Sequence, residues 1–168
     1  MSQKITPFLW FDDQAEEAAN LYVDLFKARP GTAAGQSKVT DVARYGEAGP
    51  GEPGKAMTVS FELDGQEFTG LNGGPEFGFT EAVSFLVHCG SQEEVDYFWD
   101  ALTADGGEES QCGWLKDRYG LSWQIVPDRL MELLGDPDPG RAQRAMQAML
   151  QMRKIDIATL ERAADDAA

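Results

Sequence analysis

The 168-residue sequence predicts an α+β fold of two βαβββ modules followed by C-terminal helices. Short apolar runs alternate with amphipathic segments, which is typical of mixed strands and helices. The order strand, helix, three strands occurs twice, over residues 5–72 and 82–127. After Pro127 only helical patterns follow, so we expect one domain over residues 1–127 and a helical extension over 128–168. Each module offers one helix for four strands, and a helix can cover only one face of a sheet.

The first module opens with a short apolar strand over residues 5–11. Asp12 and Asp13 are a helix-capping signal. Apolar residues then recur at helical spacing within residues 14–28, with carboxylates at the amino end. Alternating residues predict a strand over 37–45.

A hairpin completes the first module after the Gly/Pro-rich loop 46–54. Alternating runs over 56–63 and 66–72 flank Asp64 and Gly65. Asp-Gly between two such runs is a strong signal for a two-residue hairpin turn. The loop that follows contains two phenylalanines, which we expect at a cavity rim or a dimer contact.

The second module repeats this order with shorter strands. We expect a strand over 82–88, a helix over 91–104 and an irregular strand near 108–113. A second hairpin joins residues 113–117 to residues 121–127.

The two modules also match residue by residue. At an offset of 77, Phe8 matches Phe85 and Leu25 matches Leu102. In the hairpins the offsets are 53 before the turn and 55 after it, pairing Phe61 with Trp114 and Phe68 with Trp123.

The extension contains three helical segments, over residues 128–134, 140–154 and 157–164. Asp138 precedes a first-turn proline and Asp156 precedes the last segment, so both predict helix caps.

Charge excludes several classes of partner. The chain has 14 Lys and Arg against 29 Asp and Glu, a formal net charge of −15. Such a charge repels nucleic-acid phosphates and anionic membrane surfaces, so we expect neither as a partner. No apolar run approaches the roughly 18 residues of a membrane span, and no signal-peptide pattern opens the sequence. Two cysteines without a leader favour reduced thiols and a cytoplasmic protein.

Five segments give a closer resemblance, and they cover nearly the whole chain. They are ITPFLWFDDQAEEAANLYVDLF, MTVSFELDGQEFTGLNGGP, SFLVHCGSQEEVDYFWDAL, CGWLKDRYGLSWQIVP and DPDPGRAQRAMQAMLQMRKIDIATLE. The sequence resembles the PhnB-like branch of the vicinal oxygen chelate (glyoxalase/bleomycin resistance/dioxygenase) superfamily. That resemblance implies a curved mixed sheet built from two cupped half-barrels, and a homodimer.

Members of this branch often carry the name 3-demethylubiquinone-9 3-methyltransferase. A Rossmann-type methyltransferase needs a glycine-rich turn between a parallel strand and its helix. The glycine clusters here lie at 46–54 and 73–74, and neither joins such a pair. We therefore expect that the chain is not a true methyltransferase.

The resemblance also maps the superfamily's metal ligands, which are His or Glu in metal-dependent members. The corresponding positions here are Pro7, Thr69, Ser84 and Gln124. None of these side chains supplies charge, whereas divalent ions prefer carboxylates or imidazoles. We expect no metal and no cofactor.

Alternation along the strands predicts which residues face the helices and which face a cavity. The residues expected to face the helices are Phe8, Trp10, Val59, Phe61, Phe68, Val83, Phe85, Val87, Trp123 and Ile125. Those expected to face the cavity are Leu9, Thr58, Ser60, Thr69, Leu71, Ser84, Leu86, Ser122, Gln124 and Val126. The candidate ligand-binding residues are Leu9, Ser60, Thr69, Asn72, Phe79, Ser84 and Gln124.

Three functions remain open at this stage. The leading hypothesis is a metal-independent protein that binds a small molecule of unassigned identity, because the expected cavity mixes hydroxyls with aliphatic groups. A glyoxalase- or dioxygenase-type metalloenzyme would need other ligands, such as Glu62, Glu67 or His88. A structural or protein-interaction module would have its cavity filled by side chains. The sequence alone leaves open whether the chain is an enzyme, and it names no catalytic residue.

Overall fold

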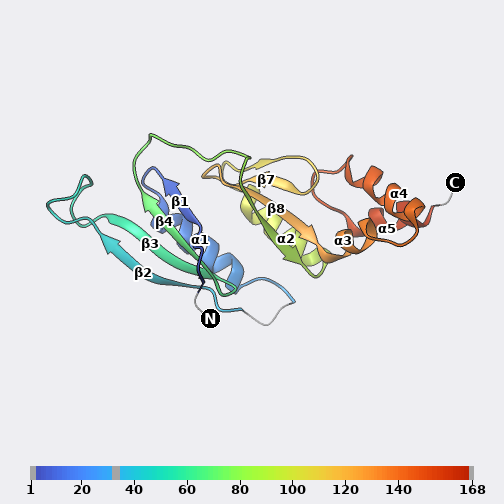
Figure 1. The fold of residues 1–168 in the computed structure, drawn as a ribbon, viewed down its shortest axis with the longest axis horizontal. Coiled ribbons are helices and arrows are strands. Elements are labelled where there is room, and N and C mark those ends of the chain that lie inside the picture. Colours follow the sequence, from blue (N-terminus) through green and yellow to red (C-terminus); the bar gives the residue numbers. More distant parts are fainter. Residues whose placement is uncertain (1–2, 32–34, 167–168) are drawn as a thin grey trace. The chain divides into compact units, whose positions relative to one another are not determined.

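The computed structural model describes residues 3–31 and 35–166, so the last two residues of the predicted extension lie outside the described part. The chain divides after Phe79 into two compact units, each with its own four-stranded sheet (Figure 1). The mixed α+β architecture confirms the predicted fold class.

The first unit contains a sheet with the strand order β1-β4-β3-β2. Strand β1 runs parallel to β4, and the other neighbours are antiparallel. The elements are β1 (Phe8–Phe11), α1 (Ala15–Lys27), β2 (Lys38–Arg44), β3 (Ala56–Leu63) and β4 (Gln66–Asn72).

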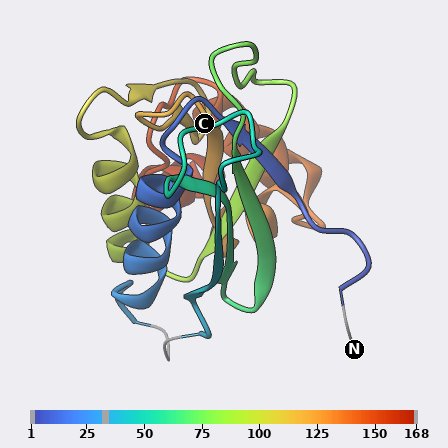
Figure 2. The ribbon, with the colours of Figure 1, turned by 90° about the vertical axis from the view of Figure 1, so that its left-hand side faces the viewer.

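Helix α1 covers one face of this sheet, as Figure 2 shows. Its buried stripe contains Ala15, Ala18, Ala19, Tyr22, Val23 and Phe26. The Tyr22 ring lies 6.2 Å from the ring of Phe61, which stacks on Phe68 at 5.3 Å. The small residues let the helix lie close to the sheet, and the aromatic rings fill the rest of the core.

The predicted hairpin turn is confirmed. Leu63 pairs with Gln66, and the two residues between them have positive φ, 51° at Asp64 and 83° at Gly65. Positive φ at both central residues matches the right-handed twist of the flanking strands.

The predicted cap of the first helix is wrong. Helix α1 begins after Gln14, and no side chain at that position caps it. Instead the amide of Ala15 donates to Oδ1 of Asn72 at 2.8 Å. The cap comes from the end of β4, 57 residues along the chain.

The second unit repeats the arrangement with the strand order β5-β8-β7-β6. Its module elements are β5 (Ser84–Cys89), α2 (Gln92–Thr103), β6 (Glu108–Glu109), β7 (Trp114–Lys116) and β8 (Ser122–Pro127). Here the cap is local, because Ser91 accepts from the amide of Glu94 at 3.2 Å and Glu94 accepts from the amide of Gly90 at 3.1 Å.

The strand pairing corrects one offset of the repeat. Phe61 pairs with Phe68 in the first sheet, and Leu115 pairs with Trp123 in the second. Leu115 therefore occupies the place equivalent to Phe61, and Trp114 lies on the other face. The longer second turn hides this shift of one residue from a comparison of sequence letters.

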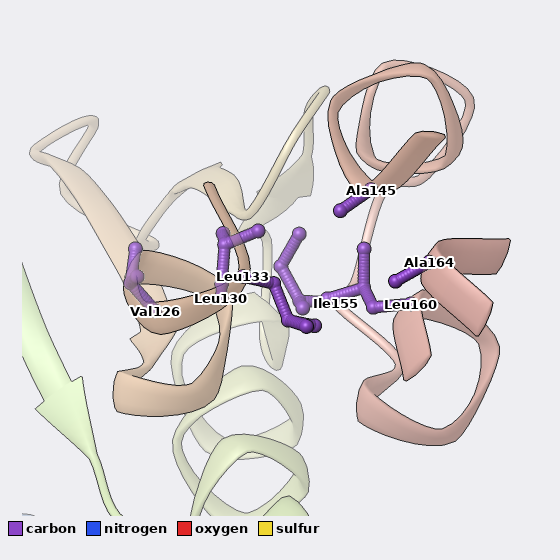
Figure 3. Close-up of a cluster of buried hydrophobic side chains, with 7 residues drawn as sticks. All are labelled: Val126, Leu130, Leu133, Ala145, Ile155, Leu160 and Ala164. Atoms are coloured by element: carbon purple, nitrogen blue, oxygen red, sulfur yellow. The ribbon is translucent and has the colours of Figure 1, made fainter. Parts of the chain in front are cut away.

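The extension folds as α3 (Asp128–Leu134), α4 (Pro139–Met149) and α5 (Ile157–Asp165). Both predicted caps are confirmed, since Asp138 accepts from the amide of Gly140 at 2.9 Å and Asp156 from that of Thr159 at 2.7 Å. The second helix is shorter than predicted. A buried cluster joins the three helices to the end of β8 (Figure 3), through Val126, Leu130, Leu133, Ala145, Ile155, Leu160 and Ala164.

The connection between α4 and α5 binds back to the second module. The amides of Cys112 and Gly113 donate to the carbonyls of Met152 and Arg153, both at 2.8 Å. Gln92 of α2 donates to the carbonyl of Ile155 at 3.0 Å and accepts from the amide of Ile157 at 2.8 Å. None of the helices in the described part of the chain is long and apolar enough to cross a membrane.

Candidate functional site

In each unit the helix covers one sheet face, and we call the opposite face the open face. The pairing of β1 with β4 shows which residues of β1 lie on it. Leu9 pairs with Gly70, where an added Cβ would meet the Cβ of Ala15 in α1 at 3.2 Å. Leu9 is 7% exposed, whereas Phe8 is 61% exposed.

The predicted faces of β1 are therefore wrong. Leu9 packs in the core on the side of α1, and Phe8 and Trp10 lie on the open face with Thr69 and Leu71. All four residues of β1 are apolar, so alternation sets the period of the strand without setting its phase. Leu9 no longer belongs to the candidate ligand-binding residues.

Two of the candidate ligand-binding residues, both with hydroxyl groups, remain on the open face of the first sheet. Ser60 pairs with Thr69, and both side chains are half-buried. The neighbouring pair, Thr58 and Leu71, adds a hydroxyl and an aliphatic group. These four residues are where alternation predicted them.

The loop after β4 covers Trp10. Its indole Nε1 donates to the carbonyl of Gly74 at 2.9 Å, and its ring meets that of Phe77 edge-on at 4.9 Å. Phe79 instead lies 5.2 Å from the ring of Phe11, a core residue on the side of α1. The two phenylalanines predicted at one rim thus lie apart, because Phe77 contacts Trp10 on the open face and Phe79 packs away from it.

Asn72 has a structural task that its sequence position does not reveal. Besides accepting from Ala15, its Nδ2 donates to the carbonyl of Ala56 at 3.0 Å. Both ends of the side-chain amide thus have protein partners, and Asn72 joins α1, β3 and β4.

A cavity of about 550 Å³ lies beside Asn72, and no sequence pattern indicates it directly. Residues 46–54, expected to be only a connecting loop, form one wall, where Gly51 lies so close to the Tyr45 ring that an added Cβ would meet it at 2.3 Å. The cations lining the cavity are paired, Arg44 with Glu16 at 3.2 Å and Lys55 with Glu52 at 2.8 Å. The hydrogen bond to Glu52 raises the pKa of Lys55.

The open face of the second sheet is more polar. Nε2 of Gln124 donates to Oγ of Ser84 at 2.9 Å, which brings together two predicted site residues. Leu86 pairs with Gln124 and is partly exposed. Val126, also predicted on this face, is buried by the helical extension and is not available to a ligand.

A smaller cavity of about 110 Å³ lies on the same face. Lys116 and Ser122, which pair across β7 and β8, line it. The other lining residues are Glu81, Glu108, Glu109, Ser110, Trp114 and Leu115. Lys116 forms a hydrogen-bonded ion pair with Glu81. This hydrogen bond raises the pKa of Lys116 and lowers the pKa of Glu81.

The four positions mapped to the superfamily's metal ligands do not fit a divalent cation. In the first unit, the amide of Thr69 donates to the carbonyl of Pro7 at 3.0 Å. In the second, Ser84 and Gln124 bond to each other. The side chains at these four positions are neutral, whereas a divalent ion prefers carboxylate or imidazole ligands.

The alternative metal ligands, Glu62, Glu67 and His88, do not come together in one metal site. Across residues 3–31 and 35–166, no group of three or more His, Cys, Asp or Glu side chains comes together in a way that could hold a metal ion. His88 lies 3.8 Å from Asp128, with both side chains exposed. Glu62 and Glu67 pair across the hairpin, and Lys38 lies 4.0 Å from Glu62. Cys89 and Cys112 are not joined by a disulfide.

Comparison with known proteins agrees with this architecture. A family model described as 3-demethylubiquinone-9 3-methyltransferase matches residues 3–126. A PhnB protein from Bacillus cereus is 37% identical, with a TM-score of 0.65 over 74% of this chain and 99% of that chain.

More distant structures share the fold. Protein PA1353 from Pseudomonas aeruginosa is 20% identical, with a TM-score of 0.57 over 75% of this chain and 98% of that chain. The fosfomycin resistance protein FosX from Listeria monocytogenes, in complex with Mn(II) and sulfate, is 16% identical, with a TM-score of 0.51 over 80% of this chain and 97% of that chain. No curated protein matches the chain.

Proposed function

Because the chain belongs to the 3-demethylubiquinone-9 3-methyltransferase-like (PhnB) family and has the vicinal oxygen chelate fold, we propose that it binds a small organic molecule without a metal ion. The open faces of the two sheets supply the binding groups. Ser60 and Thr69 serve on the first sheet, and Ser84 and Gln124 on the second.

One observation carries this proposal, the hydrogen bond between Gln124 and Ser84. In metal-dependent relatives these positions would hold charged or imidazole ligands. Here an amide and a hydroxyl lie 2.9 Å apart, which leaves an acceptor oxygen on Gln124 and a hydroxyl hydrogen on Ser84 for a ligand. Such a pair suits an uncharged polar group better than a divalent cation.

The segments that join strands to helices argue against methyl transfer of the Rossmann type. The segment from β1 to α1 is Asp12-Asp13-Gln14 and contains no glycine. The segment from β5 to α2 is Gly90-Ser91 and contains one glycine. Neither is the glycine-rich turn that allows a nucleotide-like cofactor to approach a helix amino end.

We further propose a cytoplasmic homodimer. Two large apolar side chains on the open faces, Phe8 and Leu86, are 61% and 40% exposed, and a second copy of the chain would remove them from water. Cys89 and Cys112 are not joined by a disulfide, which suits a reducing compartment. Light scattering coupled to gel filtration tests the dimer, and a monomer at micromolar concentration would contradict it.

Metal titration tests the central part of the proposal. The full chain, purified without chelator, is titrated with Zn²⁺ and with Mn²⁺ by calorimetry. We expect no stoichiometric binding, because the four mapped positions offer only neutral donors. Stoichiometric binding that is lost in Gln124→Ala would contradict the proposal and favour a metalloenzyme.

A gain-of-binding variant is the matched control. Ser84→His combined with Gln124→Glu places an imidazole and a carboxylate on neighbouring strands, where the native side chains already meet. We expect this variant to bind Zn²⁺ at least tenfold more tightly than the native chain. Gln151→Ala, an exposed change in the extension, should leave the titration unchanged.

A further inference from the structure

Ser122 differs from its cross-strand neighbour Ser84 in one chemical respect. The two residues pair in the β5–β8 ladder and lie on the same open face. Oγ of Ser84 accepts a hydrogen bond from Gln124, whereas Oγ of Ser122 has no partner. Ser122 is 0% exposed. A buried hydroxyl without a partner is uncommon in a folded protein and calls for a specific explanation.

The other polar side chains that line the cavity of about 110 Å³ beside Ser122 are paired within the protein or exposed to solvent. Lys116 pairs with Glu81. Glu109 accepts from Nε1 of Trp99 at 2.8 Å and lies 3.7 Å from Nη1 of Arg153. Ser122 thus remains as the buried hydrogen-bonding group of this cavity that the protein itself does not satisfy.

The charges around Ser122 restrict what can enter. Glu81, Glu108 and Glu109 surround a single lysine, so a carboxylate or phosphate would meet more negative than positive charge. An ammonium group, although the carboxylates attract it, has no lone pair to accept the hydrogen of the Ser122 hydroxyl. An uncharged group that donates and accepts hydrogen bonds avoids both penalties.

We infer that this cavity, which we call the Ser122 subsite, binds the neutral hydrogen-bonding end of the ligand, an alcohol or a primary amide. The inference deepens the proposed function and rests on it. The ligand oxygen accepts from the Ser122 hydroxyl, and the ligand O–H or N–H donates to a carboxylate at the cavity wall. A volume of about 110 Å³ fits a group of a few heavy atoms and leaves the rest of the ligand on the open face.

Nuclear magnetic resonance titration of the ¹⁵N-labelled full chain tests the subsite. Acetamide is the probe, and acetate and ethylammonium are its charged counterparts of similar size. The buffer contains a chelator, so the result can be read even if the metal titration contradicts the proposed function. We expect acetamide to shift the amide signals of Lys116 and Ser122 and the indole signal of Trp114, with weaker effects from both ions.

Variants decide whether the hydroxyl is responsible. Ser122→Ala should weaken acetamide binding at least fivefold, whereas Gln151→Ala should leave it within twofold. Ser122→Cys replaces the hydroxyl oxygen with a larger sulfur that is a poorer hydrogen-bonding group, so it gives a second test if the alanine variant folds poorly.

Three results would overturn the inference. One is acetamide binding that Ser122→Ala leaves unchanged. Another is acetate or ethylammonium binding as strongly as acetamide at the same signals. The third is the absence of any shift at Lys116, Ser122 and Trp114, which rejects the subsite and leaves the metal titration to judge the proposed function separately.

Discussion

The two modules have the same architecture but hold it together with different polar contacts. In the first, Asn72 caps α1 from the far end of the module, and a two-residue turn closes the hairpin. In the second, Ser91 and Glu94 cap α2 locally. There Asp117 organises a longer turn by accepting from the amides of Tyr119 and Leu121 and from Nε1 of Trp123, at 2.9, 3.1 and 2.9 Å.

This difference separates what the fold requires from what each module adds. Both modules need one apolar helix face and alternating strands. The groups that accept hydrogen bonds from the amides of a helix end or a turn can differ between the modules. The second module also carries the helical extension and a more polar open face, so the proposed ligand-specific groups concentrate there.

The largest expected difference between the modules lies in their hairpin turns. Asp117→Ala removes three acceptor contacts of a buried carboxylate and should lower the free energy of unfolding by about 3–5 kcal/mol. Gly65→Ala in the first hairpin introduces a Cβ at positive φ and should cost only about 1–2 kcal/mol. Urea denaturation measures both, and equal losses would contradict the contrast.

The two helix caps should differ by a smaller amount. Asn72→Ala removes the cap of α1 and the donor to Ala56, so we expect a loss of about 2 kcal/mol. Ser91→Ala removes a single local cap contact, with an expected loss of about 1 kcal/mol. Hydrogen exchange should show faster opening of the first turn of α1 in the Asn72 variant. If the Ser91 variant is the less stable one, a distant cap is not the stronger of the two.

The extension should depend on its attachment to α2. Gln92→Ala removes both contacts to the segment between α4 and α5 and should cost about 1–2 kcal/mol. Gln147→Ala, an exposed change in α4, is the control and should have almost no effect. Hydrogen exchange should accelerate at residues 152–157 in the first variant only. Unchanged exchange there would mean that the backbone contacts of Cys112 and Gly113 and the buried cluster hold this segment without Gln92.

The smallest expected effect compares the two serines of the second open face. Ser84→Ala leaves Gln124 without its acceptor and should cost about 1 kcal/mol. Ser122→Ala removes a buried hydroxyl that has no partner, so it should be neutral or slightly stabilising. Thermal denaturation without ligand makes the comparison. A clear loss of stability in Ser122→Ala would show that its hydroxyl has a partner in the protein.

Much of this fold could be predicted from local sequence signals. The Asp-Gly turn, the caps at Asp138 and Asp156 and the extents of β3 and β4 all follow from neighbouring residues. The phase of β1 could not be predicted, because Phe8, Leu9, Trp10 and Phe11 are all apolar and either face would serve. The cap by Asn72 depends on tertiary contact, so no local pattern indicates it.

The candidate site was predicted less completely. The alternation of hydroxyl and amide residues with apolar neighbours correctly predicted that Ser60, Thr69, Ser84 and Gln124 lie on the open faces. The sequence placed Ser122 on the same face but gave no reason to distinguish it from Ser84. The difference arises from which serine Gln124 reaches, and only the folded arrangement shows that.

Native mass spectrometry of the full chain, purified from cells without chelator, tests the central claim most directly. It weighs the folded protein together with whatever remains bound to it. The account predicts an added mass equal to a small organic molecule, with no divalent ion. A stoichiometric Zn, Ni, Mn or Fe ion that is lost in the Ser84→Ala, Gln124→Ala double variant would contradict it.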